Sequence, residues 1–163
     1  MAIKFEPTKA IYYADRGKCF KEMGRLEEAL EDLNRAIDYK NDESAFYYNR
    51  GLTYQKMNLY KKAVDDFTRV IDITREKGDA NKTELFNALY NRGNWYRILG
   101  ELEYSIDDLD EAVRTNATDP HAKNNLGLSY LENMQYDKAL EEFKNAIEIQ
   151  AESSTLYNNR GLV

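Results

Sequence analysis

The sequence is poor in cysteine and has no long apolar run. Its single cysteine, Cys19, cannot form a disulfide within the chain, so nothing in the sequence calls for an oxidising compartment. No segment approaches the roughly 20 consecutive apolar residues of a membrane helix, and the opening "MAIKFEPTKA" lacks the apolar stretch of a signal peptide. These absences predict a cytoplasmic protein that does not associate with a membrane.

The chain also has too few basic residues for a general nucleic-acid binder. It contains 23 Lys and Arg against 29 Asp and Glu, a formal net charge of -6. Nucleic acids and anionic membranes are bound through cationic surfaces. We therefore expect neither of them as a partner.

Five glycines recur in similar surroundings in a chain whose composition favours helix. The stretches are "YADRGKCF", "YYNRGLTY", "LYNRGNWY", "KNNLGLSY" and "YNNRGLV". Their glycines are Gly17, Gly51, Gly93, Gly127 and Gly161, spaced 34, 42, 34 and 34 residues apart. Small residues follow the first four glycines after 12 positions, at Ala29, Ala63, Ser105 and Ala139. The chain is therefore built from repeats.

A period of 34 residues with two helical patterns per unit is typical of the tetratricopeptide repeat. The chain resembles this family from about residue 10 to 163, with recurrent aromatic and large apolar positions at Phe20, Tyr54, Tyr96 and Tyr130, and at Leu33, Phe67, Leu109 and Phe143. The resemblance implies an all-α, right-handed superhelical solenoid of antiparallel helix pairs. The predicted parts are an N-terminal extension 1–9, repeats 10–43, 44–85, 86–119 and 120–153, and a partial repeat 154–163.

The interval of 42 residues places eight extra residues in the second repeat. We expect them to lengthen the helices on both sides of Gly78 by about one turn each, with a loose loop as the alternative. Within each repeat, the glycine lets two helices approach, and we expect Gly51 to face Ala63. The one polar residue of the small series, Ser105, is expected to bond back to its own helix.

An arginine precedes the glycine in the first three repeats, where the family more often has leucine. An aspartate follows each arginine after 16 residues, which predicts ion pairs between the two helices of a repeat. The pairs are Arg16 with Asp32, Arg50 with Asp66, and Arg92 with Asp108. The fourth repeat has Leu126 and Glu142 in these positions, so we expect no such pair there.

Polar residues stand two places before each glycine, and two helical positions subtend about 200°. These residues therefore point away from the packed face, towards the concave side that the first helices line in this family. Asn49, Asn91, Asn125 and Asn159 form a row there, and an amide both donates and accepts the bonds of a peptide backbone. The family resemblance implies the same use, because two similar repeat domains, those of O-linked N-acetylglucosamine transferase and kinesin light chain, grip peptides with asparagine rows. The flanking binding candidates are Tyr48, Tyr90, Asn94, Asn124, Lys18 and Arg97.

The pattern thus predicts a non-catalytic module that binds an extended peptide of a protein partner. We found no phosphate-binding loop, CxxC pair or HExxH motif, and expect no cofactor and no metal. The two-carboxylate clamp of chaperone-binding relatives retains only its middle asparagine here, which argues against that function. The alternatives are common ancestry of the asparagines, a targeting segment of a larger enzyme, and an assembly scaffold that uses convex or terminal surfaces. The unfinished fifth repeat also predicts self-association through the C-terminal end.

Overall fold

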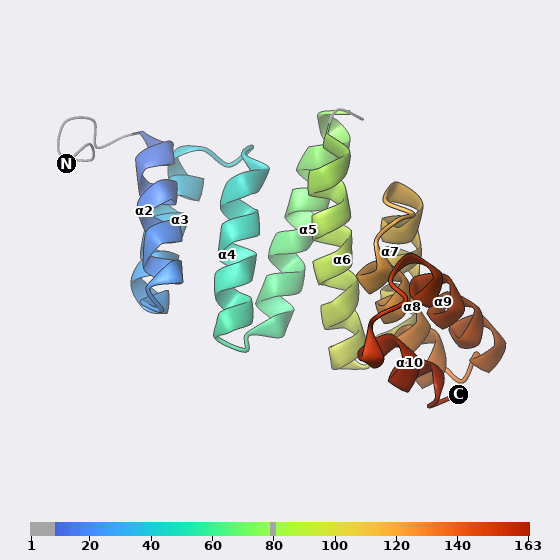
Figure 1. The fold of residues 1–163 in the computed structure, drawn as a ribbon. Coiled ribbons are helices and arrows are strands. Elements are labelled where there is room, and N and C mark those ends of the chain that lie inside the picture. Colours follow the sequence, from blue (N-terminus) through green and yellow to red (C-terminus); the bar gives the residue numbers. More distant parts are fainter. Residues whose placement is uncertain (1–8, 79–80) are drawn as a thin grey trace. The chain divides into compact units, whose positions relative to one another are not determined.

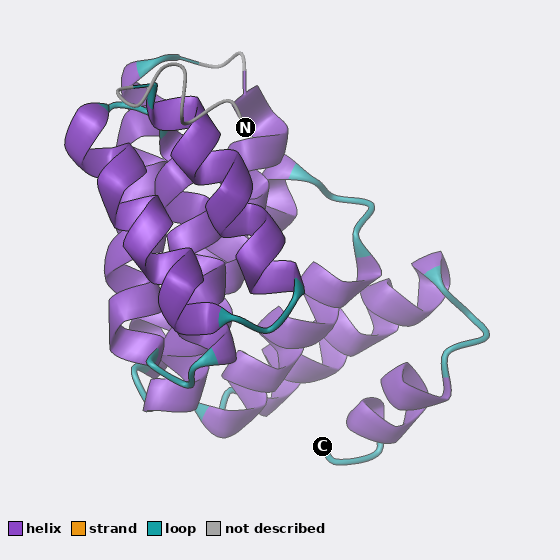
Figure 2. Ribbon diagram, turned by 90° about the vertical axis from the view of Figure 1, so that its left-hand side faces the viewer, coloured by secondary structure: helices purple, strands orange, loops and turns teal. Residues whose placement is uncertain are grey.

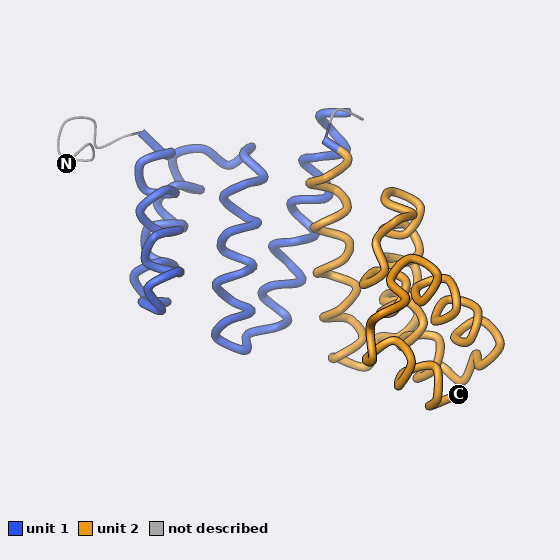
Figure 3. Tube along the Cα trace, in the orientation of Figure 1, with its two compact units in different colours: residues 1–81 blue, residues 82–163 orange. Residues whose placement is uncertain are grey.

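The computed structural model describes residues 9–78 and 81–163, and these residues form helices joined by short turns, without a strand (Figures 1 and 2). The chain divides into two compact units, residues 1–81 and 82–163 (Figure 3). Each unit is built from helix pairs in which the first helix packs on the second. The all-α prediction is confirmed for this part of the chain.

Unit 1 contains two helix pairs. The first pair is α2 (Ala10–Glu22) and α3 (Leu26–Tyr39), and the second is α4 (Ser44–Lys56) and α5 (Tyr60–Glu76). Helix α3 packs against α4, and the first helices α2 and α4 also touch. The first helices of this unit therefore lie next to each other.

Unit 2 contains two further pairs and one short helix. The pairs are α6 (Lys82–Leu99) with α7 (Leu102–Thr115), and α8 (Pro120–Glu132) with α9 (Tyr136–Ile149). The short helix α10 (Ser154–Arg160) packs on α9 and α8, with Leu156 buried beside Ala146 and Ile147. The first helices α6, α8 and α10 form a continuous row.

The eight extra residues of the second repeat lengthen two helices, as the spacing predicts. Helix α5 has 17 residues where α3, α7 and α9 have 14, and α6 has 18 where α2, α4 and α8 have 13. Helix α5 ends just before Gly78, whose φ of +82° suits a residue without a side chain. The loose-loop alternative is wrong for the described residues, while residues 79 and 80 of "KGDANK" lie outside them.

The repeated glycines lie where the two helices of a pair come closest. A Cβ atom added to Gly17 would lie 3.1 Å from the carbonyl oxygen of Ala29, the counterpart of Ala63, but the nearest neighbours of Gly51 are other residues. A Cβ atom added to Gly51 would lie 3.2 Å from the ring of Phe67 and 3.3 Å from the Cβ of Asp66, so these residues are nearer to it than Ala63. At Gly127 the added atom would lie 2.7 Å from the ring of Phe143. The large apolar residue 16 positions later fills the space that the glycine leaves open.

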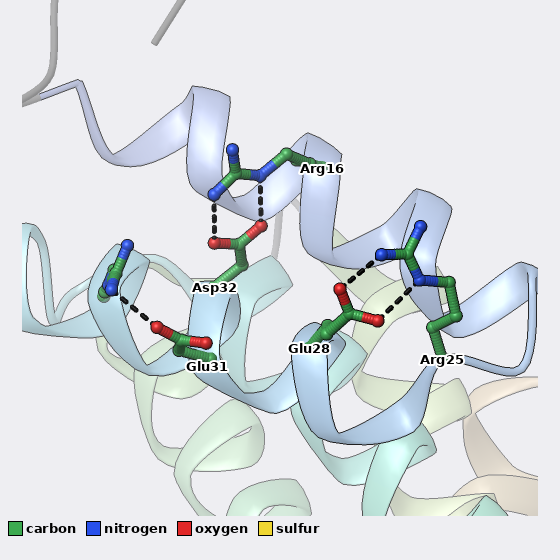
Figure 4. A network of polar contacts seen from close by, with 6 residues as sticks. Arg16, Arg25, Glu28, Glu31 and Asp32 are labelled. Atoms are coloured by element: carbon green, nitrogen blue, oxygen red, sulfur yellow. Dashed lines mark hydrogen bonds and ion pairs between the residues drawn. The ribbon is translucent and has the colours of Figure 1, made fainter.

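The predicted arginine–aspartate pairs are confirmed in the first three repeats. Each arginine donates two parallel hydrogen bonds, from Nε and Nη2, to both carboxylate oxygens of its aspartate, as Figure 4 shows for Arg16 and Asp32. The bonds measure 2.5 and 2.7 Å in the first repeat, 2.9 and 2.6 Å in the second and 2.7 and 2.7 Å in the third. This two-bond geometry fixes the relative orientation of the paired helices.

The pair in the second repeat is deeply buried. The side chain of Asp66 is 5% exposed and that of Arg50 is 20% exposed. Burial raises the pKa of Asp66, and the bonds from Arg50 offset this rise only in part. Arg50 also donates from Nη1 to Asn34 Oδ1 of the preceding repeat, at 2.8 Å. Because desolvation of the carboxylate is costly, the pair contributes little more to stability than an apolar pair in its place would. Removing one partner is nevertheless strongly destabilising, because the other charge is then buried without a partner.

The fourth repeat has different residues at the place of the arginine–aspartate pair. Leu126 is fully buried in place of the arginine, and Lys123, one turn earlier on α8, lies with Nζ 4.0 Å from Glu142 Oε2. No hydrogen bond reaches this buried oxygen within the described residues. Burial raises the pKa of Glu142 against the attraction of Lys123. The carboxylate therefore destabilises the fourth repeat when it is ionised.

We expect Arg50→Leu to lower the free energy of unfolding by about 3 kcal/mol, because Asp66 is left buried without its partner. Urea denaturation measures the loss. The double variant Arg50→Leu/Asp66→Leu should recover most of it, and Arg25→Gln, which breaks the exposed pair with Glu28 shown in Figure 4, should change nothing measurable. Equal losses in the single and double variants would refute the buried-charge explanation.

We expect Glu142→Gln to raise the melting temperature at pH 7. An acid whose pKa is raised by folding binds more protons in the native state, so its contribution to stability falls as the pH rises through its folded pKa. Glutamine removes this loss, and the advantage of the variant should disappear below the unfolded pKa of about 4.3. Melting curves of both proteins between pH 4 and pH 8, interpreted with this linkage, measure the effect. A constant difference across that range would contradict the assigned cause.

Candidate functional site

The predicted binding residues lie on the first helices of the repeats, and we call the exposed side of these helices the first-helix face. In unit 1 this face belongs to α2 and α4, and in unit 2 to α6, α8 and α10. The four asparagines of the row are partly exposed on it: Asn49, Asn91, Asn125 and Asn159. Their hydrogen bonds differ from one position to the next.

In unit 1, Asn49 uses both ends of its amide. Its Nδ2 donates to the carbonyl oxygen of Ala45 at 2.8 Å, and its Oδ1 accepts a bond from Lys21 Nζ at 3.1 Å. Lys21 is only 4% exposed, and burial lowers its pKa. The amide of Asn49 thus partly replaces the water that this ammonium group has lost.

Lys21 is a site residue that is not among the binding candidates predicted from the sequence, although a signal for it exists. Lys21 stands four positions after Gly17, which is the place of Arg97 relative to Gly93. Comparison of these two positions could have found it. Two more lysines join this side of unit 1: Lys18 is exposed, and Lys56 donates from Nζ to the carbonyl oxygen of Lys21 at 3.4 Å.

In unit 2, Asn125 is the centre of a network of side-chain bonds. Its Nδ2 donates to the hydroxyl of Tyr90 at 3.0 Å and to Oδ1 of Asn94 at 2.9 Å. Its Oδ1 accepts a bond from Asn124 Nδ2 at 3.2 Å, and Asn159 Nδ2 donates to Asn124 Oδ1 at 2.7 Å. We call these five residues the amide network, and it connects α6, α8 and α10.

Asn91 belongs to the same row but takes a different partner. Its Nδ2 donates to the carbonyl oxygen of Asn87 at 2.7 Å, one turn earlier on its own helix. Asn49 does the same with Ala45, whereas Asn125 and Asn159 reach across to the preceding first helix. The row is therefore not one uniform ladder, because the Nδ2 groups of Asn49 and Asn91 bond within their own helix and those of Asn125 and Asn159 bond to the preceding first helix.

Three of the predicted aromatic and cationic candidates have structural partners as well: Tyr48, Tyr90 and Arg97. The ring of Tyr48 packs edge-on against Phe67, with 5.7 Å between the centroids, and Tyr90 stacks on Phe86 at 6.0 Å. Arg97 donates from Nη1 to Glu132 Oε1 at 2.5 Å, which joins the C-terminal ends of α6 and α8. Of these candidates, Tyr90 is the one that enters the amide network.

A buried pair of serines also bonds to the amide network, at the backbone of Asn125. Ser105 Oγ and Ser129 Oγ lie 2.8 Å apart, both without solvent exposure, and Ser129 donates to the carbonyl oxygen of Asn125 at 3.0 Å. Since Ser129 spends its hydrogen on that carbonyl, Ser105 donates to Ser129. The expectation that Ser105 bonds to its own helix is wrong, because a neighbouring hydroxyl on α8 lies within reach.

Groups typical of metal or membrane sites do not occur in the described residues. Across 9–78 and 81–163, no three His, Cys, Asp or Glu side chains lie close enough together to hold a metal ion. None of the helices described is both long and apolar enough to cross a membrane. Cys19 is exposed on α2 of unit 1, and His121 lies on α8 of unit 2.

We expect Asn125→Ala to lower the free energy of unfolding by about 1 to 2 kcal/mol, because three side-chain hydrogen bonds in a partly buried network are lost. Asn94→Ala removes one of these bonds and should cost about a third as much. Chemical denaturation of both variants measures the difference. Equal stability of Asn125→Ala and the parent protein would mean that water replaces the network without loss.

Comparison with known proteins agrees with this architecture. A family model described as TPR repeat matches residues 17–58, and two models described as tetratricopeptide repeats match residues 44–74 and 120–153. Among curated proteins, none matches the chain.

Solved structures with the same fold are numerous. The structure of YrrB, described as a TPR protein with an unusual peptide-binding site, is 24% identical, with 99% of this chain and 79% of YrrB covered at a TM-score of 0.85. A structure of MamA is 22% identical over 94% of this chain and 79% of MamA, at a TM-score of 0.85. A structure of MamA from Desulfovibrio magneticus RS-1 is 22% identical over 94% of this chain and 82% of that MamA chain, at a TM-score of 0.84. The chain is thus an all-α helical-repeat solenoid and belongs to the tetratricopeptide repeat family.

Proposed function

We propose that the chain is a non-catalytic interaction module that binds an extended peptide segment of a protein partner along its first-helix faces. The family serves in general as a non-catalytic interaction module, which supports this function class. The observation that carries the finer proposal is the amide network of unit 2. It gathers four asparagines and a tyrosine hydroxyl on one partly exposed row of helices.

The hydrogen-bond capacity that remains in the network suits a peptide backbone. An asparagine amide has two N–H donors and two acceptor lone pairs, and Asn125 spends both donors inside the network. Asn94 and Tyr90 enter the network as acceptors, so their N–H and O–H hydrogens stay available for peptide carbonyls. The second lone pair on Asn125 Oδ1 is available for a peptide N–H.

The strength of such contacts limits what the amides achieve alone. At about 0.5 to 1.5 kcal/mol for each neutral hydrogen bond, four bonds supply a few kcal/mol, whereas a micromolar complex needs about 8. Side-chain contacts of the peptide must supply the rest. In unit 1 the exposed Lys18 favours acidic peptide residues, whereas the charge of Lys56 is shared with Glu22, whose Oε2 lies 3.8 Å from its Nζ.

The solved structure of YrrB supports the choice of ligand class by analogy. YrrB is described as having an unusual peptide-binding site, and its fold matches nearly the whole of this chain. At 24% identity this similarity shows the fold alone, so the binding of a peptide by this chain is part of the proposal. Cytoplasmic location, self-association through the C-terminal end and service to a larger enzyme or scaffold remain predictions of the sequence.

Binding is tested with the variant Asn91→Ala/Asn125→Ala. Peptides selected from a displayed random library on the parent protein should bind this variant at least about tenfold more weakly, because main-chain partners are lost. Fluorescence anisotropy with the selected peptides measures the affinity, at a temperature where circular dichroism shows both proteins folded.

The control is Asn41→Ala/Asn133→Ala, which removes two asparagines from turns outside the first-helix face. The control should bind like the parent protein. Selected peptides that bind the Asn91→Ala/Asn125→Ala variant and the parent equally well would show that the asparagine row reflects common ancestry rather than peptide binding.

A further inference from the structure

The turn between α8 and α9 holds a methionine in a backbone conformation that methionine rarely adopts. Met134 has a φ of +58°, in the left-handed region that favours residues without a bulky side chain. The three other turns that join a first helix to a second one carry Gly24, Asn58 and Gly100 at this position, with φ of +76°, +59° and +82°. Glycine and asparagine suit this conformation, so Met134 alone is strained there.

The strain at Met134 is not offset by burial. Its side chain is 75% exposed, and Tyr136, two residues further on, is 53% exposed. An open surface pocket of about 350 Å³ lies at this turn, and we call it the turn pocket; it is lined by Met134, Gln135, Tyr136, Asp137 and Lys138. A large apolar side chain held in a strained turn and left in water points to a contact with another molecule.

The surroundings of the turn pocket are acidic. Lys138 Nζ lies 5.3 Å from the centre of the Tyr130 ring, so the pocket adjoins Tyr130. Burial raises the pKa of Tyr130, and carboxylates of both second helices raise it further: Asp110, Glu142, Asp107 and Glu141. Helix α7 carries five acidic residues and one basic residue, and α9 carries four and two. A ligand that reaches this turn therefore enters a negative field.

We propose that the turn pocket docks a basic segment of a partner protein, which places one large apolar or aromatic side chain against Met134 and Tyr136. The lysines or arginines of that segment lie along the carboxylates of α7 and α9. Methionine suits this role because its flexible, polarizable side chain adapts to aromatic and aliphatic partners. The field of the second helices selects the basic segment and accelerates its approach. The first-helix face takes no part, so this docking is independent of peptide binding there.

The probe is a short fluorescein-labelled peptide with one tryptophan between lysines. Two matched peptides replace its lysines by glutamates or its tryptophan by serine. Fluorescence anisotropy with the whole chain should show binding of the lysine–tryptophan peptide that weakens with added salt. Both matched peptides should bind at least about tenfold more weakly. Equal binding of all three peptides would overturn the proposal.

The decisive variant is Met134→Gly, which removes the apolar side chain and the strain together. It should raise the melting temperature and weaken peptide binding by about tenfold, a combination that a purely structural role of Met134 does not produce. Met23→Gly is the matched control, because Met23 is 69% exposed in the α2–α3 turn with an ordinary φ of -77°. This control should bind the probe like the parent protein.

Two more variants are informative. One separates the contribution of charge from that of the apolar contact with Met134 and Tyr136, and the other separates binding at the turn pocket from binding at the first-helix face. Asp137→Asn/Glu141→Gln should weaken binding a few-fold and flatten its salt dependence, whereas Asn91→Ala/Asn125→Ala should leave it unchanged. Unchanged binding by Met134→Gly, or an equal loss in Met23→Gly, would overturn the proposal. A loss in Asn91→Ala/Asn125→Ala alone would overturn it too, because the probe would then bind the first-helix face.

Discussion

The close contact between the two helices of a repeat is the constraint on which the rest of the structure depends. At Gly51 and Gly127, an aromatic ring from the second helix occupies the space that a side chain would need. The neighbouring arginine in the first three repeats then reaches an aspartate on the second helix with two bonds. With the glycine fixed inward, a residue two positions earlier points outward. The exposed row of asparagines is thus a geometric consequence of the contact.

The amides in this row already have partners before any ligand arrives: Asn125 and Asn159 bond to residues of the amide network, and Asn49 and Asn91 bond to carbonyl oxygens of their own helices. Asn125 ties α8 to α6, and Asn159 ties α10 to α8, so these side chains set the spacing of the first helices as well as their chemistry. A ligand meets donors and acceptors whose positions are already held by bonds. Such preorganisation lowers the entropy lost on binding. Under the proposed function, stability and recognition therefore share the same residues in unit 2.

The repeat pattern predicts contacts within a repeat much better than contacts between repeats. The helix pairs, the two lengthened helices and the ion pair between Arg50 and Asp66 follow from spacing, because one helix pair has one closest approach. The bonds of Lys21 with Asn49 and of Ser105 with Ser129 join different repeats, and they depend on how neighbouring pairs stack. The position of a residue within the repeat does not by itself determine how neighbouring helix pairs stack. The left-handed conformation at Met134 could have been predicted from the sequence. The corresponding positions of the other repeats hold Gly24, Asn58 and Gly100, residue types that favour this conformation.

The charges of unit 2 separate its two candidate surfaces. Helix α6 carries one acidic residue against three basic ones, whereas the second helices α7 and α9 carry nine acidic residues against three basic ones. Hydrogen bonds act over about 3 Å, so the amide network discriminates by the position of ligand atoms after contact. The acidic helices act over about 8 to 10 Å, so they discriminate by charge before contact. Because these interactions have different ranges and arise on different helices, the two proposed sites of this unit would take unlike segments of a partner without competition between them.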